Sequence, residues 1–277
     1  MPELPEVETV KRGLETVLPG LTVEKITVNR HDLRHPIPEN LVEQIKGRKF
    51  IGVKRRAKYL LLEMEGGVTL LSHLGMSGSW VVRKKGEYKP QTHDHIILSL
   101  KGDKEAVFND PRRFGLLLPL KTRDIDKHPL LKHLGPEPLE KAFSPDYLEE
   151  ALKTRSGPIK TALMNQELVV GVGNIYASEA LFRAKVHPSV PAKHVAARAK
   201  DIIYAVQAVL KDAIKSGGST LRNYAQASGD TGYFQHYFLV YGREGKPCTV
   251  CETPISKITQ VGRSTFFCKH CQKRPKK

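Results

Sequence analysis

The chain has 277 residues and a formal net charge of +16, from 45 Lys+Arg against 29 Asp+Glu. Apolar residues make up 40% and charged residues 27%, which excludes a disordered chain and fits a globular protein of about two domains. Apolar runs of about five residues are too short to span a membrane, and the acidic start does not resemble a signal peptide. We therefore expect a cytoplasmic protein with no membrane partner. The charge excess favours a polyanionic partner, of which nucleic acid is the most abundant.

The first part of the chain reads as one helix followed by strands. Val7, Val10 and Leu14 recur at the spacing of one buried helical face, which predicts a helix over residues 5–18. From about residue 22 to 120, alternating residues and short apolar runs separated by glycine turns predict a β-rich domain.

After this β-rich domain, the spacing of the apolar residues becomes that of helices. Ser144 is a plausible N-cap for a helix that starts at Pro145. Further helices are predicted over three segments, and Gly217–Gly218 should end the last one. These segments are residues 159–168, residues 175–185 and residues 190–215. The polar residues 219–236 read as a loop, and the last 35 residues as a separate small module.

Basic residues concentrate in two places. Residues 46–58 contain seven basic and no acidic residues, and residues 243–277 contain nine basic and two acidic residues. Each run alone is equally compatible with a solvated face. Two such runs far apart in the sequence favour a shared nucleic-acid groove.

All four cysteines lie in the terminal module, with the spacing C-x2-C-x16-C-x2-C. Two C-x-x-C turns supply the four thiolates of a tetrahedral zinc site. Two disulfides or a redox pair are the alternatives: a cytoplasmic chain disfavours structural disulfides, and neither cysteine pair lies in the βαβ pattern of a redox motif. Four protein ligands leave no open position, so the single Zn²⁺ should be structural. The residues between the turns read as two strands that present Arg263 at the tip of a hairpin. The proposed ligands are Cys248, Cys251, Cys268 and Cys271.

The N-terminus offers a candidate nucleophile. Aminopeptidases remove Met1 before a small residue, which would expose the secondary amine of Pro2. Such an amine attacks an aldehyde-like carbon and gives a cationic iminium directly, while Glu3 or Glu6 beside it could move protons. A plain helix start remains the alternative, because Pro-Glu-Leu-Pro-Glu also suits a first helical turn.

A set of distinctive motifs runs along the chain: PELPEVET, RRAKYLLLE, HLGMSGS, NDPRRFG, VVGVGNIYASEALF, GGSTLRNYAQASGDTGYF and GRSTFFC. With these motifs the chain resembles bacterial formamidopyrimidine-DNA glycosylase nearly from end to end. This base-excision repair family acts on 8-oxoguanine and ring-opened purines. The sister enzyme endonuclease VIII usually opens PEGPE, so Leu4 favours the formamidopyrimidine branch.

The resemblance implies an α+β fold in three parts. An N-terminal β-sandwich domain with an N-terminal helix would cover residues 1–133. A helical helix–two-turn–helix domain with a lesion loop would cover residues 134–235, and a zinc-finger β-hairpin module residues 236–277. Monomeric action is the default expectation.

The family's catalytic roles map onto single residues. Pro2 would attack C1′ of the damaged nucleotide and Glu3 would protonate the deoxyribose. Lys58 is implied to assist β-elimination, and Arg263 to assist δ-elimination and grip a phosphate. The likeness thus implies a bifunctional DNA glycosylase and AP lyase acting on damaged double-stranded DNA.

The resemblance also implies DNA contacts. Met76, Arg112 and Phe114 match the residues that fill the space left by an extruded base. Further matches hold DNA phosphates or belong to the lesion loop. The phosphate set is His93, Arg155, Lys160 and Asn174, and the lesion-loop set is Thr220, Arg222 and Tyr224.

Two places depart from the family pattern. Asn165 stands where an aspartate is expected, and Tyr237–Phe238 replaces a more polar pair. Two other functions stay open at this point: an endonuclease VIII-like glycosylase for oxidised pyrimidines, and a zinc-ribbon nucleic-acid-binding protein without catalysis.

Overall fold

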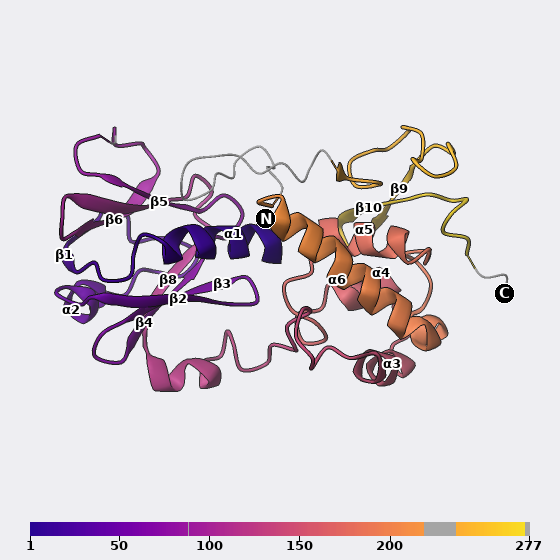
Figure 1. Cartoon of the computed structure of the whole chain (residues 1–277), viewed down its shortest axis with the longest axis horizontal. Coiled ribbons are helices and arrows are strands. Elements are labelled where there is room, and N and C mark those ends of the chain that lie inside the picture. Colours follow the sequence, from indigo (N-terminus) through magenta and orange to yellow (C-terminus); the bar gives the residue numbers. More distant parts are fainter. Residues whose placement is uncertain (88, 219–236, 275–277) are drawn as a thin grey trace. The chain divides into compact units, whose positions relative to one another are not determined.

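The computed structural model describes residues 1–87, 89–218 and 237–274, and the chain divides into two compact units (Figure 1). Unit 1 contains residues 1–132 together with 216–233, and unit 2 contains residues 133–215 together with 234–277. Each unit is described by itself below. None of the described helices is long and apolar enough to cross a membrane.

Unit 1 is built from two four-stranded antiparallel sheets. One sheet has the order β1-β6-β7-β5, and the other has the order β2-β3-β4-β8. This arrangement confirms the predicted β-sandwich. The strands are β1 (Val23–Val28), β2 (Phe50–Arg56), β3 (Tyr59–Met64), β4 (Val68–His73), β5 (Ser79–Lys84), β6 (Asp94–Leu100), β7 (Lys104–Asn109) and β8 (Leu116–Lys121). The short helices are α2 (Leu41–Ile45) and the 3₁₀ segment η1 (Thr122–Lys127).

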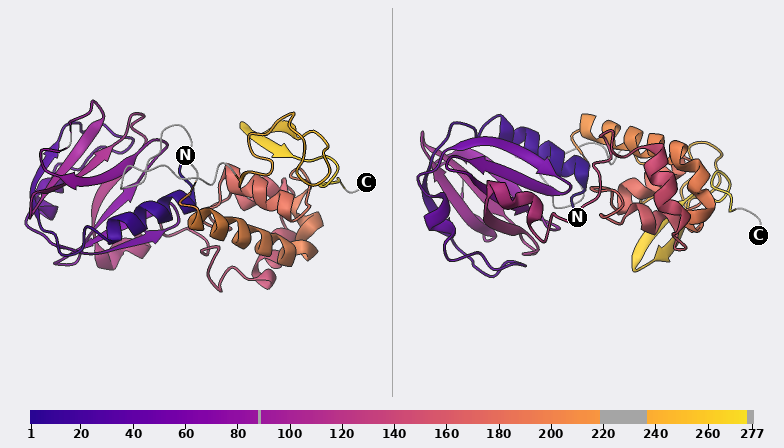
Figure 2. Two further views of the ribbon diagram at one scale, coloured as in Figure 1. Left: turned by 45° about the horizontal axis from the view of Figure 1, so that its top comes forward. Right: turned by 90° about the horizontal axis from the view of Figure 1, so that it is seen from below.

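Helix α1 (Leu4–Glu15) packs along the sandwich of unit 1, against β2 and β3 (Figure 2). It confirms the helix predicted near the start, although it ends three residues early. Its apolar stripe of Val7, Val10 and Leu14 is fully buried in one core with the inward residues of both sheets. The burial of this stripe fixes the direction of the helix, and therefore where its first turn lies.

Unit 2 is mainly helical. Ser144 caps α3 (Pro145–Lys153) as predicted, because its hydroxyl accepts the amide N–H of Tyr147 at 3.2 Å. Helix α5 (Asn174–Arg183) packs against α6 (Ala199–Lys215), and Tyr176 of α5 is fully buried in the core that the two helices share. The remaining helical segments are α4 (Ile159–Leu163) and the 3₁₀ segment η2 (Ala192–Arg198).

The predicted helix over residues 159–168 is wrong beyond Leu163, where α4 ends. Asn165 accepts the amide N–H of Glu167 at 2.8 Å, and the amide group of Gln166 bonds the backbone of Val172 and Gly171. Polar side chains that bond nearby backbone groups in this way favour turns over helix. The predicted helix over 190–215 likewise begins as η2 and becomes α-helical only from Ala199.

The last described residues of unit 2 form the predicted two-stranded hairpin. Strand β9 (Ser256–Gln260) pairs with β10 (Arg263–Phe267), and β10 lies against α5. A small core surrounds two of the cysteines with Val240, Ile255 and Phe266, and Phe182 of α5 packs into it. This core is too small to hold the module without a further crosslink.

Candidate active site

The first turn of α1 is buried, and the carboxylates of Glu3 and Glu6 cap its backbone N–H groups. Pro2 is buried, and Glu3 and Glu6 are each only 3% exposed. Glu3 occupies the N-cap, where its side chain accepts a backbone N–H while its own N–H donates to Glu6 at 2.8 Å. The two acids are therefore held in fixed positions beside the N-terminus, and the structure agrees with the helix-start interpretation of this segment.

The terminal amine shares this place with cationic groups. Burial lowers the pKa of the Met1 α-amino group; Glu3 and Glu6 raise it in turn, while Lys58 and Arg112 lower it further. These shifts place one amine, two carboxylates and two basic side chains within electrostatic reach of one another.

Two loops of unit 1 meet through a glycine. Gly75 has φ +60°, and a Cβ atom there would lie 2.3 Å from the carbonyl carbon of Phe114. Asp110, fully buried, ties the same loops together: its carboxylate accepts the Ser77 hydroxyl at 2.6 Å and the Gly115 amide at 2.7 Å. The loop before β5 and the loop before β8 therefore form one rigid unit.

Three side chains stand on these joined loops. Met76 and Phe114 are 38% and 41% exposed, and the Arg112 guanidinium lies 5.0 Å from the centre of the Phe114 ring. Exposed apolar side chains of this size on a rigid loop suit insertion into another surface. The structure thus brings the predicted filling set together, and His93 adjoins it through its carbonyl, which accepts the Asp110 amide at 3.0 Å.

Sequence reasoning missed His73, at the end of β4. Burial lowers its pKa from 6.5 to about 4, with Lys58 and Arg34 adding to the effect. Its Nδ1 accepts the Gly75 amide at 2.9 Å, so the neutral ring carries its proton on Nε2. The motif HLGMSG contained this histidine, but only the fold places it near Lys58.

His73 should make stability depend on pH. Its folded pKa is depressed, so the unfolded chain takes up the proton first, and stability is lost as pH falls from 6.5 towards about 4. We expect wild type to lose about 2 kcal/mol more unfolding free energy between pH 7.5 and pH 5 than His73→Asn, whose amide oxygen also accepts the Gly75 N–H. Urea titrations at both pH values measure this difference; equal losses in the two proteins would contradict it.

Unit 2 gathers a second group of predicted residues. The buried Lys160 ammonium donates to Asn174 Oδ1, to Thr265 Oγ1 at 2.7 Å and to the Ser264 carbonyl at 3.3 Å. The Asn174 amide also donates to the Ser264 carbonyl, at 3.0 Å. Lys160 and Asn174 therefore fasten α4 and α5 to the strand that begins with Arg263.

A hollow of about 260 Å³ opens beside this junction. Lys160, Arg263 and Asn165 are among its lining residues, so the first family departure lies at the site. An asparagine there carries no negative charge that would oppose an anion. Arg155 lies at the end of α3 and does not line this hollow; its Nε donates to the Ala151 carbonyl at 3.2 Å.

The turn of the zinc hairpin fixes where Arg263 stands. Val261 and Gly262 both have positive φ, +48° and +70°, which is the pattern of a two-residue hairpin turn. Arg263 pairs with Gln260 as the first residue after that turn, and is exposed. The prediction that Arg263 is presented at the tip matches this geometry.

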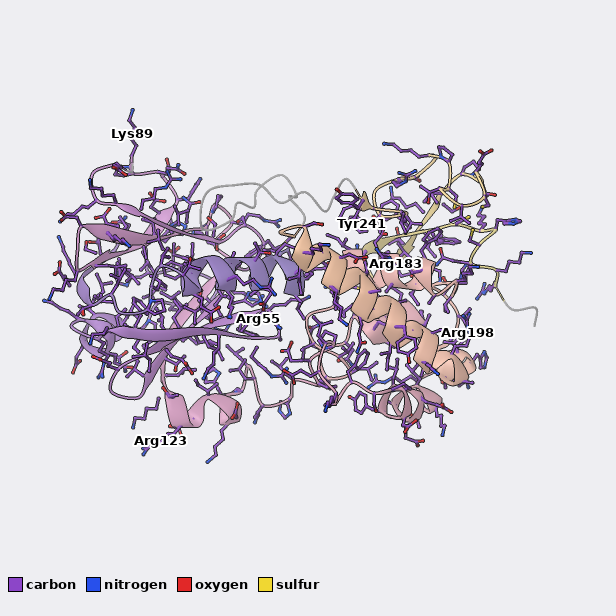
Figure 3. All side chains as sticks on the ribbon, in the orientation of Figure 1. Arg55, Lys89, Arg123, Arg183, Arg198 and Tyr241 are labelled. Carbon is purple, nitrogen blue, oxygen red and sulfur yellow. The ribbon has the colours of Figure 1, made fainter. Side chains whose placement is uncertain are left out.

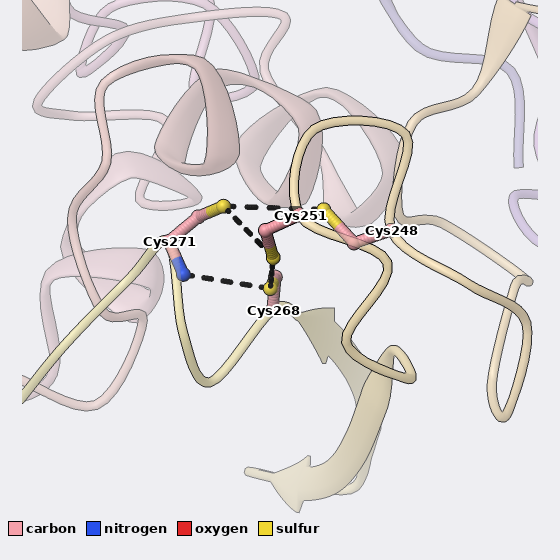
Figure 4. A group of neighbouring side chains, drawn as sticks. All are labelled: Cys248, Cys251, Cys268 and Cys271. Atoms are coloured by element: carbon pink, nitrogen blue, oxygen red, sulfur yellow. Dashed lines mark hydrogen bonds between the residues drawn. The ribbon is translucent and has the colours of Figure 1, made fainter.

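The four cysteine sulfurs lie within 4.8 Å of one another (Figure 4). The closest pairs are Cys251–Cys268 at 3.4 Å and Cys251–Cys271 at 3.5 Å, and none of the four is in a disulfide. Zinc–sulfur bonds of about 2.3 Å place tetrahedral thiolates about 3.8 Å apart, so the cluster fits one zinc ion with four protein ligands. Gln272 supports it by accepting the Cys268 amide at 2.9 Å.

A buried carboxylate anchors the segment that leads into the zinc module. Glu179 of α5 accepts the backbone N–H groups of Leu239, Val240 and Tyr241 at 2.8–3.0 Å. Burial raises the pKa of Glu179, and these N–H groups oppose that rise. Sequence reasoning missed this residue, because its partners lie about sixty positions away.

The second departure from the family pattern is the pair Tyr237–Phe238. Tyr237 is exposed, whereas Phe238 is buried with its ring 5.7 Å from that of Tyr241.

The lesion-loop residues Thr220, Arg222 and Tyr224 lie outside the described residues. The described residue directly before this segment is Gly218, which has φ +76°. Gly218 lies against Glu6, and both residues belong to unit 1. A Cβ atom at Gly218 would come within 3.3 Å of three Glu6 atoms. Only glycine fits this approach without strain.

Models of known families match three stretches of the chain. Residues 1–117 match the formamidopyrimidine-DNA glycosylase N-terminal domain, and residues 134–225 match the H2TH domain of the same enzymes. Residues 245–274 match a zinc finger found in FPG and IleRS. The matches therefore cover the sandwich, the helices and the zinc hairpin.

Curated relatives and solved structures extend the match to the full length. Formamidopyrimidine-DNA glycosylases of Azorhizobium caulinodans and Ruegeria pomeroyi are each 47% identical to the chain, covering 99% of it and 100% of the relative. The MutM (Fpg) protein of Thermus thermophilus superposes with a TM-score of 0.88 at 40% identity, and a Lactococcus lactis Fpg mutant in complex with Fapy-dG DNA with 0.92 at 34%. Both superpositions cover 99% of this chain and 100% of the other. The chain belongs to the formamidopyrimidine-DNA glycosylase family.

Proposed function

We propose that this chain is the base-excision repair glycosylase that removes oxidised purines, 8-oxoguanine and formamidopyrimidines, from DNA. It is a bifunctional enzyme, a DNA glycosylase that also nicks abasic sites, since lyase activity is a property of the family. The observation that carries this function is the full-length identity of 47% to named glycosylases. The burial of Pro2 and Glu3 beside Lys58 supports it. A zinc-ribbon protein without catalysis would not need that arrangement.

Pro2 is the nucleophile of the proposed mechanism, once Met1 has been removed. Its secondary amine forms a bond to C1′ of the damaged nucleotide as the glycosidic bond breaks, and the departing base takes the proton that the amine loses. Glu3 donates a proton to the ring oxygen of the sugar, so the deoxyribose opens and a cationic iminium remains. Because Glu3 is held by its N-cap bonds, its carboxyl group stays close to the amine.

Strand cleavage follows from the iminium. The cation acidifies the adjacent C2′–H, and loss of that proton expels the 3′ phosphate. Loss of the C4′–H in a second elimination then expels the 5′ phosphate. Lys58 assists the first elimination and Arg263 the second, because each supplies positive charge to a phosphate that is leaving. The products are a one-nucleoside gap and two phosphate ends.

The remaining predicted residues hold the DNA. Met76, Arg112 and Phe114 fill the space of the extruded base; the thioether and ring replace lost stacking, and the guanidinium pairs with the orphaned cytosine. Their position on two loops joined at Gly75 keeps them rigid. We propose that His93, Arg155 and Asn174 bind phosphates. The Lys160 ammonium is buried and donates to Asn174, Thr265 and Ser264, so it holds Asn174 and β10 in place and does not itself reach a phosphate. Thr220, Arg222 and Tyr224 are proposed to contact the extruded base.

One structural zinc completes the enzyme, held by the four clustered cysteines. Damaged double-stranded DNA is its substrate, and we propose that it acts as a monomer in the bacterial cytoplasm, on DNA of the nucleoid. Its three functional domains are residues 1–133, 134–235 and 236–277. The zinc ion has no catalytic step, because four thiolates leave no open position on it.

Lesion preference separates this function from the endonuclease VIII branch. A structure of a Lactococcus lactis Fpg contains DNA with an oxidised pyrimidine. Excision of an oxidised purine must therefore be compared directly with excision of an oxidised pyrimidine. Under single-turnover conditions, we expect excision of 8-oxoguanine opposite cytosine to be at least about tenfold faster than excision of thymine glycol. An abasic-site duplex serves as the control for lyase activity. Faster excision of thymine glycol would contradict the assignment to oxidised purines.

A further inference from the structure

The two-residue turn between β2 and β3 carries Lys58 in a strained backbone. Arg56 pairs with Tyr59, so Ala57 and Lys58 alone make the turn. Ala57 has φ +54°, in the left-handed region that residues other than glycine rarely adopt. Lys58, directly after it, is only 7% exposed. Something besides the intrinsic preference of alanine must therefore hold this turn in place.

Arg55 supplies such a hold. Its Nη1 donates to the carbonyl oxygen of Ala57 at 2.9 Å, across the strained residue. Its Nε donates to the carboxylate of Glu8 at 2.9 Å, and the two side chains are only 12% and 16% exposed. A partly buried guanidinium that uses two edges of its fork is fixed in direction, unlike a surface ion pair.

The partner of Arg55 links the turn to the other catalytic element. Glu8 belongs to α1, whose first turn contains Glu3 and follows Pro2. Arg55 comes from β2, which packs on α1 (Figure 3). The chain of contacts therefore runs from α1 through Glu8 and Arg55 to the carbonyl of Ala57, one residue before Lys58.

We propose that Arg55 and Glu8 are positioning residues. They hold the turn at Ala57, so that Lys58 keeps its place relative to the nucleophile Pro2, which precedes α1. This inference rests on the proposed function of Lys58 in β-elimination. In this proposal both residues act through Lys58 and not on the substrate. Loss of Arg55 should let Ala57 relax to negative φ and displace Lys58, while the Pro2 end of α1 remains in place.

Arg55→Met should therefore separate two steps of the reaction. We expect strand cleavage at an abasic site to slow about tenfold, because small misplacements of a catalytic group are costly. Borohydride trapping of the covalent adduct should stay within about twofold of wild type, since Pro2 and Glu3 form the iminium before Lys58 acts. The matched control is Arg12→Met, which removes the other cation bound to Glu8, at 3.0 Å, and leaves the Ala57 contact intact. It should cleave at the wild-type rate.

Ala57→Gly provides the rescue. Glycine adopts positive φ without steric cost, so the double variant Arg55→Met, Ala57→Gly should regain most of the lost cleavage rate. Hydrogen exchange of the peptide that contains residues 57–59 gives a readout independent of activity. Exchange should be faster in Arg55→Met than in wild type or Arg12→Met, and slower again in the double variant.

Several outcomes would overturn the inference. The first is that Arg55→Met and Arg12→Met cleave the abasic site at the same rate. The second is that adding Ala57→Gly to Arg55→Met does not restore the cleavage rate. The third is that trapping by Arg55→Met falls in parallel with its cleavage rate and its melting temperature. Absence of any adduct in wild type would instead reject the proposed function, and the exchange measurement would still decide whether Arg55 holds the turn.

Discussion

Replacing Pro2 with glycine should lower strand cleavage at an abasic site by about 100-fold or more, because a positioned covalent nucleophile is lost. Glycine also permits removal of Met1, so the variant still exposes an α-amine. That primary amine gives a neutral imine, which must gain a proton before it becomes an electron sink, whereas proline gives the cation directly. Glycine also lacks the ring that is buried in wild type.

Binding must be measured beside this rate. Pro2→Gly should bind a duplex with a non-cleavable abasic analogue within a few-fold of wild type, since the DNA contacts proposed above lie on other residues. Fluorescence anisotropy measures the affinity, and a quenched-flow gel assay measures cleavage. Cleavage by Pro2→Gly at the wild-type rate would reject Pro2 as the nucleophile.

Removal of the zinc ion should abolish DNA binding. The small core around the cysteines cannot keep β9 and β10 folded without the metal, whose binding free energy is about 10–16 kcal/mol in isolated zinc modules. Unfolding of the hairpin releases Arg263 and breaks the contacts of Lys160 with Ser264 and Thr265. Chelation, or Cys268→Ser, followed by zinc analysis and anisotropy, measures this effect.

Arg263→Gln is the matched control for zinc loss. It should keep the zinc and the folded hairpin, since the side chain is exposed and no cysteine depends on it. It should weaken binding by a smaller factor than chelation does, because only one phosphate contact is removed. Full DNA affinity and activity in protein shown to be free of zinc would contradict a structural role of the metal.

Features that depend on local spacing could be predicted from the sequence. The cysteine spacing predicted a cluster that the structure brings within 4.8 Å, and the apolar period of Val7, Val10 and Leu14 predicted α1. Ser144 predicted a helix start through its cap. Each of these signals involves residues that are close in sequence, or a metal whose ligand geometry is strict.

Features that depend on partners far apart in the sequence could not be predicted in this way. Glu179 meets the backbone of residues 239–241, and Arg55 meets Glu8, forty-seven positions away. Asp110 was part of a quoted motif, but its role appears only when Ser77 lies against it. The helix predicted over 159–168 failed for a local reason, because Asn165 and Gln166 bond backbone groups and turn the chain.

The most direct test of the catalytic claim is to trap and map the covalent intermediate. Wild-type protein whose N-terminus has been confirmed by mass as Pro2 is incubated with 8-oxoguanine duplex and borohydride, and the crosslinked peptide is sequenced by mass spectrometry. We predict one adduct, carried on the nitrogen of Pro2 and absent from Pro2→Gly. An adduct on a lysine, or no adduct while the strand is still cleaved, would contradict the account.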